Sequence, residues 1–506
     1  MRAVCDDFTA GLVVAKNKGF MMRKLSLTIG SLIAFCSCSP GFASVPSTTA
    51  GVVGISIGTD LTVDSGFGDQ GYTVVNYNDD GGTWDEAVRV MPAEGDGLWL
   101  VGFHRTDASA DRLAISKLDA DGRLDPSFGS GGKTLIDTGI SFVRDAIRVD
   151  DRFYVVGMHL LTSSGPGVMA IACVEVDATY CPGFGDAQGT ITIALNAPGF
   201  TSEALRILHR DGKLYVIGNT DPGGKLGHSS AMAVAKLDAS TGALDASFGD
   251  GSGPLPGTVV FNPDLFPDGN DFAYSTAFAS NGMILIGGAA QNNDNQGSDG
   301  YVLAFDPASG ALDTSFGTAG YAYLSFNTGV HFDQVSVRAI HVFDDGRIVV
   351  AGDANHDDEF FNTLTDVLLA SFEPDGTPSA DFGVGGATHI NVGLNASVLD
   401  MGIRSNGDIV VSMSTNGINP NPYTSDTLQS IAQFDASGNG PTSTVSIEYP
   451  SMVTPGGAPT SLYVDARDRV LVAGFRLWDF NFPVPDSDHS LTRLVRDGIF
   501  TSGFEL

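Results

Sequence analysis

The chain has 506 residues, too long for one ordinary hydrophobic core, yet no linker or low-complexity segment divides it. Charged residues make up 17% of the sequence, below the roughly 25% typical of globular domains, and 64 residues are glycine, which suits short strands joined by tight turns. With 27 Lys and Arg against 59 Asp and Glu, the net charge of −32 excludes nucleic acid as an expected partner, because a polyanion would be repelled.

The N-terminus has the pattern of a secretory signal peptide. Two basic residues precede an apolar run over residues 25–35, and small residues that suit a signal peptidase follow. We therefore expect residues 1–43 to be removed on export, with Met21 or Met22 as the true start, and residues 44–60 to form a short N-terminal segment. The mature protein is expected to be secreted, periplasmic or on the cell surface, and no later run approaches the ~18 apolar residues of a transmembrane segment.

From residue 61 onward, four short apolar segments recur in a fixed order, which we name D, A, B and C. In the first copy they span residues 72–77, 86–91, 98–103 and 113–118, and the next D segment spans 133–136. The B segments, such as LWLVG from Leu98, are rich in β-branched and aromatic residues and are bounded by Gly or Asp-Gly. This pattern predicts strands that are buried on both faces.

Tight turns are expected between the A and B segments, at Asp211-Gly212, Asn281-Gly282, Asp345-Gly346 and Asn406-Gly407. Such dipeptides favour two-residue hairpins in which both central residues have positive φ. Each copy then becomes a four-stranded antiparallel meander. Because the B segment occurs seven times, residues 61–506 are predicted to form an all-β, seven-bladed β-propeller.

A six-residue motif closes most copies and recurs about every 60 residues. It reads LDPSFG at Leu124–Gly129, LDASFG at Leu244–Gly249 and LDTSFG at Leu312–Gly317. We expect its Phe to pack between blades and its Asp and Ser to bond the backbone of a turn. The Phe positions are Phe67, Phe128, Phe184, Phe248, Phe316 and Phe382.

These copies, each preceded by a B strand ending near Gly and a C strand ending in Asp, resemble the delta-60 repeat family of bacterial exported proteins. The resemblance implies a propeller-like repeat protein and supplies no catalytic residues. The chain opens with a D segment and ends with a C segment, so the ring is predicted to close when the strand at 72–77 pairs with the strand at 490–495. That pairing would remove an open sheet edge.

Cysteine usage changes with the predicted cleavage. Only Cys173 and Cys181 remain in the mature chain, eight residues apart within one copy. In an exported protein this spacing predicts a local disulfide, with two free thiols as the alternative.

Long and variable connections gather on one side of the predicted ring, where the D–A and B–C loops emerge. They span residues 104–111, 221–230, 291–300, 353–366, 414–427 and 476–489. Loops on a rigid scaffold are where binding usually occurs. An acidic loop at Asp353–Glu359 and an aromatic surface at Phe360, Phe361, Tyr423, Trp478 and Phe480 are the features of interest there.

Four carboxylates stand near the start of predicted innermost strands and could line the mouth of a channel: Glu86, Asp145, Glu203 and Asp400. They could hold a cation such as Ca²⁺, although solvated carboxylates without a metal are the interpretation we favour. We expect no cofactor and identify no catalytic residue.

The sequence leaves three functions open. The first is an exported, non-catalytic propeller, monomeric, that binds a glycan or a protein on the long-loop face. The second is a hydrolase or lyase that uses the channel-mouth carboxylates, with or without a cation. The third is a purely structural surface protein.

Overall fold

The computed structural model describes residues 53–57, 61–77, 84–106, 111–162, 165–195, 200–221, 230–249, 251, 253–262, 269–291, 297–324, 334–357, 363–392, 395–416, 427–448, 457–479 and 486–496. All of them belong to one unit, residues 50–506. Apart from the short 3₁₀ turn η1 (Glu94–Asp96), the regular structure in these ranges is β-strand. Within the same ranges, no helix has the length and apolar character needed to cross a membrane.

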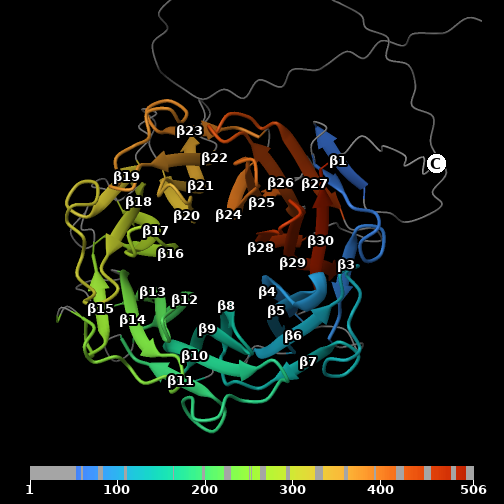
Figure 1. Cartoon of the computed structure of the whole chain (residues 1–506), viewed down its shortest axis with the longest axis horizontal. Helices are drawn as coiled ribbons and strands as arrows, with labels where there is room; N and C mark the ends of the chain where they lie inside the picture. The colour runs from blue at the N-terminus through green and yellow to red at the C-terminus, as the bar shows by residue number, and fades with distance from the viewer. Residues whose placement is uncertain are drawn as a thin grey trace, which may run out of the picture. The chain divides into compact units, whose positions relative to one another are not determined.

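Consecutive strands pair antiparallel into meanders, in the predicted order A, B, C and D (Figure 1). The first three are β4 (Trp84–Pro92), β5 (Leu98–Arg105), β6 (Arg112–Leu118) and β7 (Lys133–Ile136); β8 (Phe142–Val149), β9 (Arg152–Leu160), β10 (Gly167–Glu175) and β11 (Thr190–Ile193); and β12 (Ser202–Arg210), β13 (Lys213–Thr220), β14 (Ala231–Asp238) and β15 (Thr258–Phe261). The next two are β16 (Asp271–Phe278), β17 (Ile284–Gln291), β18 (Ser298–Phe305) and β19 (Tyr321–Leu324); and β20 (Gln334–Val342), β21 (Ile348–Asp357), β22 (Thr363–Phe372) and β23 (Ala387–Ile390). The last are β24 (Ala396–Ile403), β25 (Ile409–Asn416), β26 (Thr427–Phe434) and β27 (Ser443–Glu448), followed by β28 (Gly457–Val464), β29 (Val470–Asp479) and β30 (Asp486–Val495).

The N-terminal strands complete sheets that are formed by the end of the chain. Strand β3 (Tyr72–Val75) pairs antiparallel with β30, from Tyr72 opposite Thr492 to Val75 opposite His489. The two-residue β2 (Thr62–Val63) also pairs with β30. Strand β1 (Val53–Ile57) adds a fifth strand at the edge of β27. It lies in residues 44–60, for which no strand was predicted.

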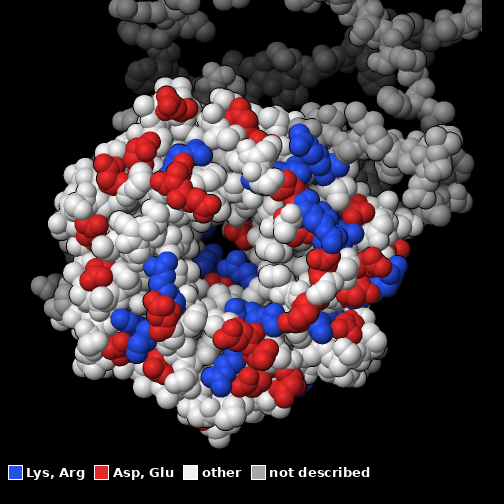
Figure 2. Space-filling view, viewed as in Figure 1, with Lys and Arg blue, Asp and Glu red and all other residues white. Residues whose placement is uncertain are grey.

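The first strand of every meander contributes to a central cavity of about 430 Å³. Each of these strands also contains a β-bulge, where one extra residue lies opposite its partner strand. The bulged residues are Val88, Arg144, Leu205, Tyr274, Arg338, Leu399 and Thr460. Figure 2 shows Lys or Arg atoms, with some Asp or Glu atoms, in the hollow at the centre. A bulge redirects side chains along a strand, so it determines which residues reach this cavity.

The A–B turns are only partly as predicted. At Asp211-Gly212, both residues have positive φ (51° and 70°), as a two-residue hairpin requires. At the three other dipeptides only the glycine has positive φ, and the loop is longer. The backbone N–H of Gly282, for example, donates to Ala279 O at 3.0 Å. The prediction of positive φ at both positions is therefore wrong there, because a turn of the ordinary type with glycine last makes the same connection.

The repeated motif joins neighbouring meanders. Phe248 is buried among residues of β13 and β14 on one side and of β16 and β17 on the other. Its ring lies against Gly310 in the turn that follows β18, where a Cβ would come within 3.1 Å of the ring. The next residue, Gly249, has a φ of 112° and donates its N–H to Ser309 O at 2.9 Å. The other motif phenylalanines are buried as well: Phe67, Phe128, Phe184, Phe316 and Phe382.

The motif Asp and Ser stabilise a turn of the backbone. The carboxylate of Asp245 accepts hydrogen bonds from the N–H and the hydroxyl of Ser247, at 3.2 and 2.6 Å. These hydrogen bonds, led by the one from the hydroxyl, lower the pKa of Asp245 to about 2. Asp125 and Asp313 accept the same pair of bonds from Ser127 and Ser315. Turn formation accounts for these carboxylates without a ligand.

Candidate functional site

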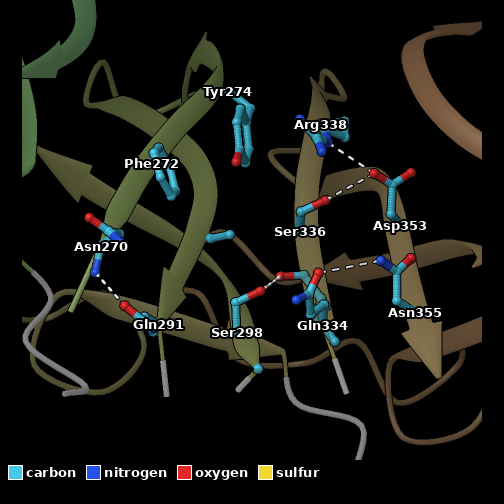
Figure 3. Close-up of a pocket in the computed structure, with 13 residues that line it drawn as sticks. Asn270, Phe272, Tyr274, Gln291, Ser298, Gln334, Ser336, Arg338, Asp353 and Asn355 are labelled. Carbon is cyan, nitrogen blue, oxygen red and sulfur yellow. Dashed lines mark hydrogen bonds and ion pairs between the residues drawn. The ribbon is translucent and has the colours of Figure 1, made fainter. Parts of the chain in front are cut away.

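A cavity of about 240 Å³ opens between β16–β18 and β20–β21, at the end of the strands from which the long loops emerge (Figure 3). We call it the loop-side cavity. Its lining residues alternate along three strands, because residues two apart in a strand face the same side. They are Asn270, Phe272 and Tyr274; Gln334, Ser336 and Arg338; and Asp353 and Asn355, and the rest of the lining is Ala289, Gln291, Gly297, Ser298 and Val335.

Aromatic rings form one wall of the loop-side cavity. The rings of Phe272 and Tyr274 are stacked, with centroids 6.0 Å apart and planes 14° apart. The guanidinium of Arg338 lies over the Tyr274 ring, 4.0 Å from its centroid. A cation held against a ring in this way fixes both side chains, so the wall is preorganised. Tyr274 and Arg338 are the bulged residues of β16 and β20, so they occupy equivalent positions along the first strands of neighbouring meanders.

Carboxamides form the polar part of the lining, with Asn270 and Gln291 on the side of the aromatic rings and Gln334 and Asn355 on the other side (Figure 3). Gln291 accepts from the backbone N–H of Asn270 at 2.9 Å, and the amide nitrogen of Asn355 lies 3.5 Å from the Gln334 side-chain oxygen. The side-chain oxygen of Asn355 is buried and has no hydrogen-bond partner within the described part of the chain. A buried acceptor without a donor is costly, so this oxygen indicates a place for a hydroxyl or amide group of a ligand.

Asp353 is the carboxylate of the loop-side cavity as far as the described residues show. Its oxygens accept from Arg338 Nε at 3.0 Å, from the Ser336 hydroxyl at 3.3 Å and from the backbone N–H of Val398 in the next meander at 2.6 Å. Burial raises the pKa of Asp353, and the positive charge of Arg338 opposes that rise. With these partners the carboxylate positions Arg338 and leaves little freedom for a role as acid or base.

The predicted acidic loop at residues 353–359 is partly wrong. Strand β21 continues to Asp357, and Asp353 pairs with Val367 of β22. The rest of that segment lies outside the described residues. So do Phe360, Phe361, Tyr423 and Phe480 of the predicted aromatic surface, together with the side chain of Trp478.

A second cavity of about 360 Å³ adjoins the first and shares Asn270 and Phe272 with it. It lies between β12–β13 and β16, and its polar lining includes Glu203, Asn219 and Thr220. The side-chain oxygen of Asn219 accepts from the backbone N–H of Ala273 at 2.9 Å, which ties the two meanders together. The two cavities thus form one elongated depression with the Phe272 ring between them.

The predicted ring of channel-mouth carboxylates does not form. Asp145 and Asp400 follow the bulges of β8 and β24 and line the central cavity, whereas Glu86 and Glu203 precede the bulges of their strands. Relative to the bulge, the glutamates lie three residues before the aspartates, which is about 10 Å along a strand at ~3.3 Å per residue. The bulge, which local sequence does not reveal, is the physical reason for the error.

Each of these carboxylates already has protein partners. Arg89 donates to Asp145 from Nε at 2.9 Å and lies 3.6 Å from Asp400 through Nη1. The backbone N–H of Ile207 donates to Asp145 at 3.2 Å, and that of Leu462 donates to Asp400 at 2.8 Å. Both bonds run to the next meander.

The two glutamates are also engaged. Glu203 is paired with Arg144, and Glu86 accepts from Trp84 Nε1 at 3.3 Å. Among the described residues, no group of three His, Cys, Asp or Glu side chains could hold a metal ion, so Ca²⁺ binding by this set gains no support.

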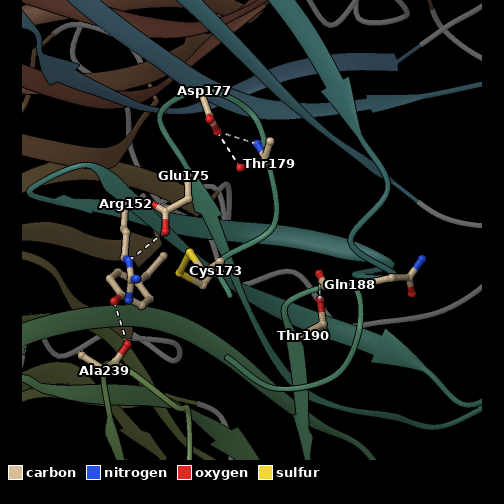
Figure 4. Close-up of a disulfide and its surroundings, with 10 residues drawn as sticks. Arg152, Cys173, Glu175, Asp177, Thr179, Gln188, Thr190 and Ala239 are labelled. Carbon is tan, nitrogen blue, oxygen red and sulfur yellow. Dashed lines mark hydrogen bonds and ion pairs between the residues drawn. A yellow bond between two sulfur atoms is a disulfide. The ribbon is translucent and has the colours of Figure 1, made fainter. Parts of the chain in front are cut away.

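Cys173 and Cys181 form the predicted disulfide (Figure 4). Cys173 lies in β10 and Cys181 follows it, with Cα atoms 5.4 Å apart. Both side chains are buried in the same core cluster as the motif residue Phe184. The bond therefore fixes the connection between a C strand and its motif, and it lies away from the cavities.

Comparisons with known proteins concern the repeat and the fold. Residues 209–248, 279–316 and 344–382 match a family model described as a β-propeller domain of unknown function (DUF5122). Each match begins near an A–B turn and ends at a motif Phe, so the model covers the B strand, the C strand and the motif of three copies. The curated proteins include no match.

Several solved structures are similar at low identity. An ulvan lyase bound to -[GlcA(1-4)Rha3S]- is 12% identical, covering 84% of this chain and 96% of its own, with a TM-score of 0.46. The polysaccharide lyase Uly1 is 12% identical, with coverages of 81% and 90% and a TM-score of 0.43. The β-propeller domain of the trilobed protease from Pyrococcus furiosus is 8% identical, with coverages of 83% and 99% and a TM-score of 0.38. No functional argument rests on these similarities. The family match and the strand pairing together identify an all-β protein built from β-propeller repeats.

Proposed function

We propose that this chain is an exported, non-catalytic β-propeller that binds a glycan in the loop-side cavity. The observation that carries the proposal is the lining of that cavity, where a stacked aromatic pair faces carboxamide side chains. A sugar presents hydroxyl groups at its edge and C–H groups on its faces. Carboxamides both donate and accept hydrogen bonds, and an aromatic ring covers an apolar face.

The described surface favours a glycan over a protein partner. Large exposed hydrophobic side chains in the described ranges are few: Leu161, Phe200 and Val384, which lie in three different connections. A stable protein interface usually has a buried apolar core, which scattered residues do not supply. A concave site with a few fixed polar groups is instead typical of small-ligand recognition.

The charges favour an uncharged glycan. Arg338 is the basic residue among those that line the loop-side cavity, and Asp353 neutralises it. Glu203 lines the adjoining cavity, and the whole chain has a net charge of −32. An anionic polymer would be repelled at long range, whereas a neutral chain of several sugars could follow the depression past Phe272.

The alternative of a hydrolase or lyase finds less support. Glycosidases generally use two carboxyl groups on either side of the scissile bond, and Asp353 stands alone within the described lining. The channel-mouth carboxylates Asp145 and Asp400 are held by Arg89 and by backbone N–H groups. A carboxylate with its oxygens occupied is a poor base or ligand.

We further propose that the meanders are the seven blades of one closed ring of delta-60 repeats, a single domain over residues 61–506. The pairing of β3 with β30 supports closure, as does the bridge between Ser487 and Trp84 of β4. The same proposal includes export with removal of residues 1–43. It also includes a secreted, periplasmic or cell-surface location and a monomeric state.

The test is a glycan array followed by titration calorimetry with the strongest hit. Tyr274→Ala should weaken binding about tenfold or more, because truncating a central aromatic contact commonly costs ~1.4–2 kcal/mol. Tyr323→Ala is the matched control, since Tyr321 and Tyr323 form a similar stacked pair on β19, with centroids 5.6 Å apart, outside both cavities.

Two results would contradict the proposal. If Tyr323→Ala weakened binding as much as Tyr274→Ala, the glycan would bind elsewhere or the loss would reflect stability. If the protein cleaved its glycan and Asp353→Asn abolished cleavage, the non-catalytic part of the proposal would be wrong.

A further inference from the structure

The central cavity is unusually basic for so acidic a chain. Its lining contains five arginines and two carboxylates, Asp145 and Asp400, although the chain as a whole has a net charge of −32. The arginines come from the innermost strands β4, β8, β12 and β20 and are Arg89, Arg144, Arg148, Arg206 and Arg338. Basic atoms are visible within the central hollow in Figure 2.

Four of these arginines have carboxylate partners. Arg89 pairs with Asp145 and approaches Asp400, and the other three pair with acidic residues outside the cavity lining. These pairs are Arg144 with Glu203, Arg148 with Glu94 and Arg338 with Asp353. Their charges are therefore largely neutralised within the protein.

Arg206 differs from the others. Its hydrogen bond in the structure runs from Nη1 to the backbone oxygen of Leu205 at 2.7 Å, and no described carboxylate forms an ion pair with it. A guanidinium has five N–H donors, so four remain for another partner. Burial lowers the pKa of Arg206, and the positive charges of Arg89 and Arg338 lower it further. The negative charges of Asp145 and Asp400 oppose this by raising the pKa.

We propose that the central cavity binds a small oxyanion at Arg206, which lines this cavity and not the loop-side cavity, although Arg338 borders both. The planar fork of a guanidinium matches the spacing of two oxygens on a sulfate, phosphate or carboxylate group and holds them by charge-assisted hydrogen bonds. The volume of about 430 Å³ accommodates such an ion with several waters, each of which occupies about 30 Å³ in the liquid. The inference does not depend on glycan binding.

Oxyanion chemistry is shared by inorganic ions and by acidic sugars, and the experiment separates these sources. Thermal unfolding of the full mature chain is measured in sulfate, phosphate and glucuronate, each against chloride at equal ionic strength. A ligand that binds the folded state raises the melting temperature in a saturable manner. We expect at least one oxyanion to do so where chloride does not, and the effective ion identifies the source.

Variants locate the site. Arg206→Gln should weaken the apparent affinity about tenfold or more, as expected for charge-assisted hydrogen bonds worth ~1.5–3 kcal/mol. Arg123→Gln is the matched control, because it removes the same charge from an exposed residue that pairs with Asp121 away from the cavity. Arg206→Lys keeps the charge and removes the fork, and we expect it to bind more weakly than the wild type.

Each outcome decides the proposal. Equal stabilisation by chloride and the oxyanions, or an equal loss in Arg123→Gln, means an adventitious ion only and overturns it. Should Arg206→Gln fail to fold, Arg206→Lys decides: unchanged affinity in that variant overturns the guanidinium site, and a loss with normal unfolding in chloride supports it.

Discussion

The motif phenylalanines offer the sharpest test of how the repeats are held together, and Phe382 is the clearest example. It is 2% exposed and packs with Val367 and Leu369 of β22 and with Val398 of β24. It thus joins two neighbouring meanders. Truncation of a buried Phe costs about 3–5 kcal/mol, from lost transfer free energy and from the remaining cavity. We expect Phe382→Ala to lower the free energy of unfolding by that amount in urea titrations followed by circular dichroism.

A second substitution tests the contact itself. Gly438, in the turn after β26, has a φ of 79°, and a Cβ there would collide with the Phe382 ring. In the wild type, Gly438→Ala should cost left-handed backbone strain of roughly 1–2 kcal/mol plus the collision. In a Phe382→Ala background only the strain remains, so the cycle should show a coupling of about 1 kcal/mol or more.

Val384→Ala is the control for this experiment. It lies two residues further along the chain and is 91% exposed, so its cost should stay within about 0.5 kcal/mol. The reasoning would be refuted if Phe382→Ala cost no more than Val384→Ala. It would also be refuted if Gly438→Ala cost the same in both backgrounds.

Four further substitutions probe buried charges and the disulfide. Burial lowers the pKa of His489 to about 4 from 6.5, so the unfolded chain binds more protons between these values. The free energy of unfolding should therefore rise with pH across this window by roughly 3 kcal/mol, and His489→Gln should remove that contribution in unfolding titrations at pH 4, 5 and 7. Asp145→Ala should cost about 3 kcal/mol or more, because Arg89 keeps only the more distant Asp400 and the buried N–H of Ile207 loses its acceptor. Glu203→Ala, whose partner Arg144 is exposed, should cost under about 1 kcal/mol, and equal losses in urea titrations would contradict the difference in burial. Cys181→Ser opens an eight-residue loop and should cost about 2–3 kcal/mol relative to the oxidised wild type, with little further loss when reductant is added.

Strand positions could be predicted because the information is local. The B strand expected at residues 98–103 is β5, Leu98–Arg105, and the D strand expected at residues 133–136 is β7 with those bounds. Short apolar runs between Gly or Asp-Gly leave little choice of strand limits. The pairing of residues 72–75 with β30 could be predicted from the order of the segments. The first copy begins with a D strand and the last copy ends with a C strand, so the last copy lacks the D strand that the N-terminus supplies.

Which strands pair outside the repeat could not be predicted in the same way. Strand β1 pairs with β27, a contact between residues about 390 positions apart in the sequence. Its sequence VGISI has the apolar alternation of many strands and nothing that selects one edge. Such pairing is decided by where the preceding and following chain emerges, which is a property of the whole fold.

Part of the lining of the loop-side cavity could be recognised in the sequence. Polar residues alternate with apolar ones at 334–338, so a polar face was readable in that strand, whereas Asp271 interrupts the alternation at 270–274. Which two faces meet across a cavity was not readable, because that depends on the stacking of neighbouring meanders. The bulges at Tyr274 and Arg338, which place the guanidinium over the ring, add one residue whose position no local pattern reveals.

The residue that follows the bulge explains both why the predicted cation site does not form and why arginines enter the central cavity. Where it is acidic, as at Asp145 and Asp400, the side chain accepts a backbone N–H of the next meander and serves the packing of the repeats. Where it is Arg89 or Arg206, a guanidinium enters the central cavity instead. Two such acids and two such arginines would balance, but Arg89 engages both acids. Arg206 then has no carboxylate of the described residues within ion-pair distance, and an oxyanion from solution would accept from the guanidinium donors that Leu205 leaves open.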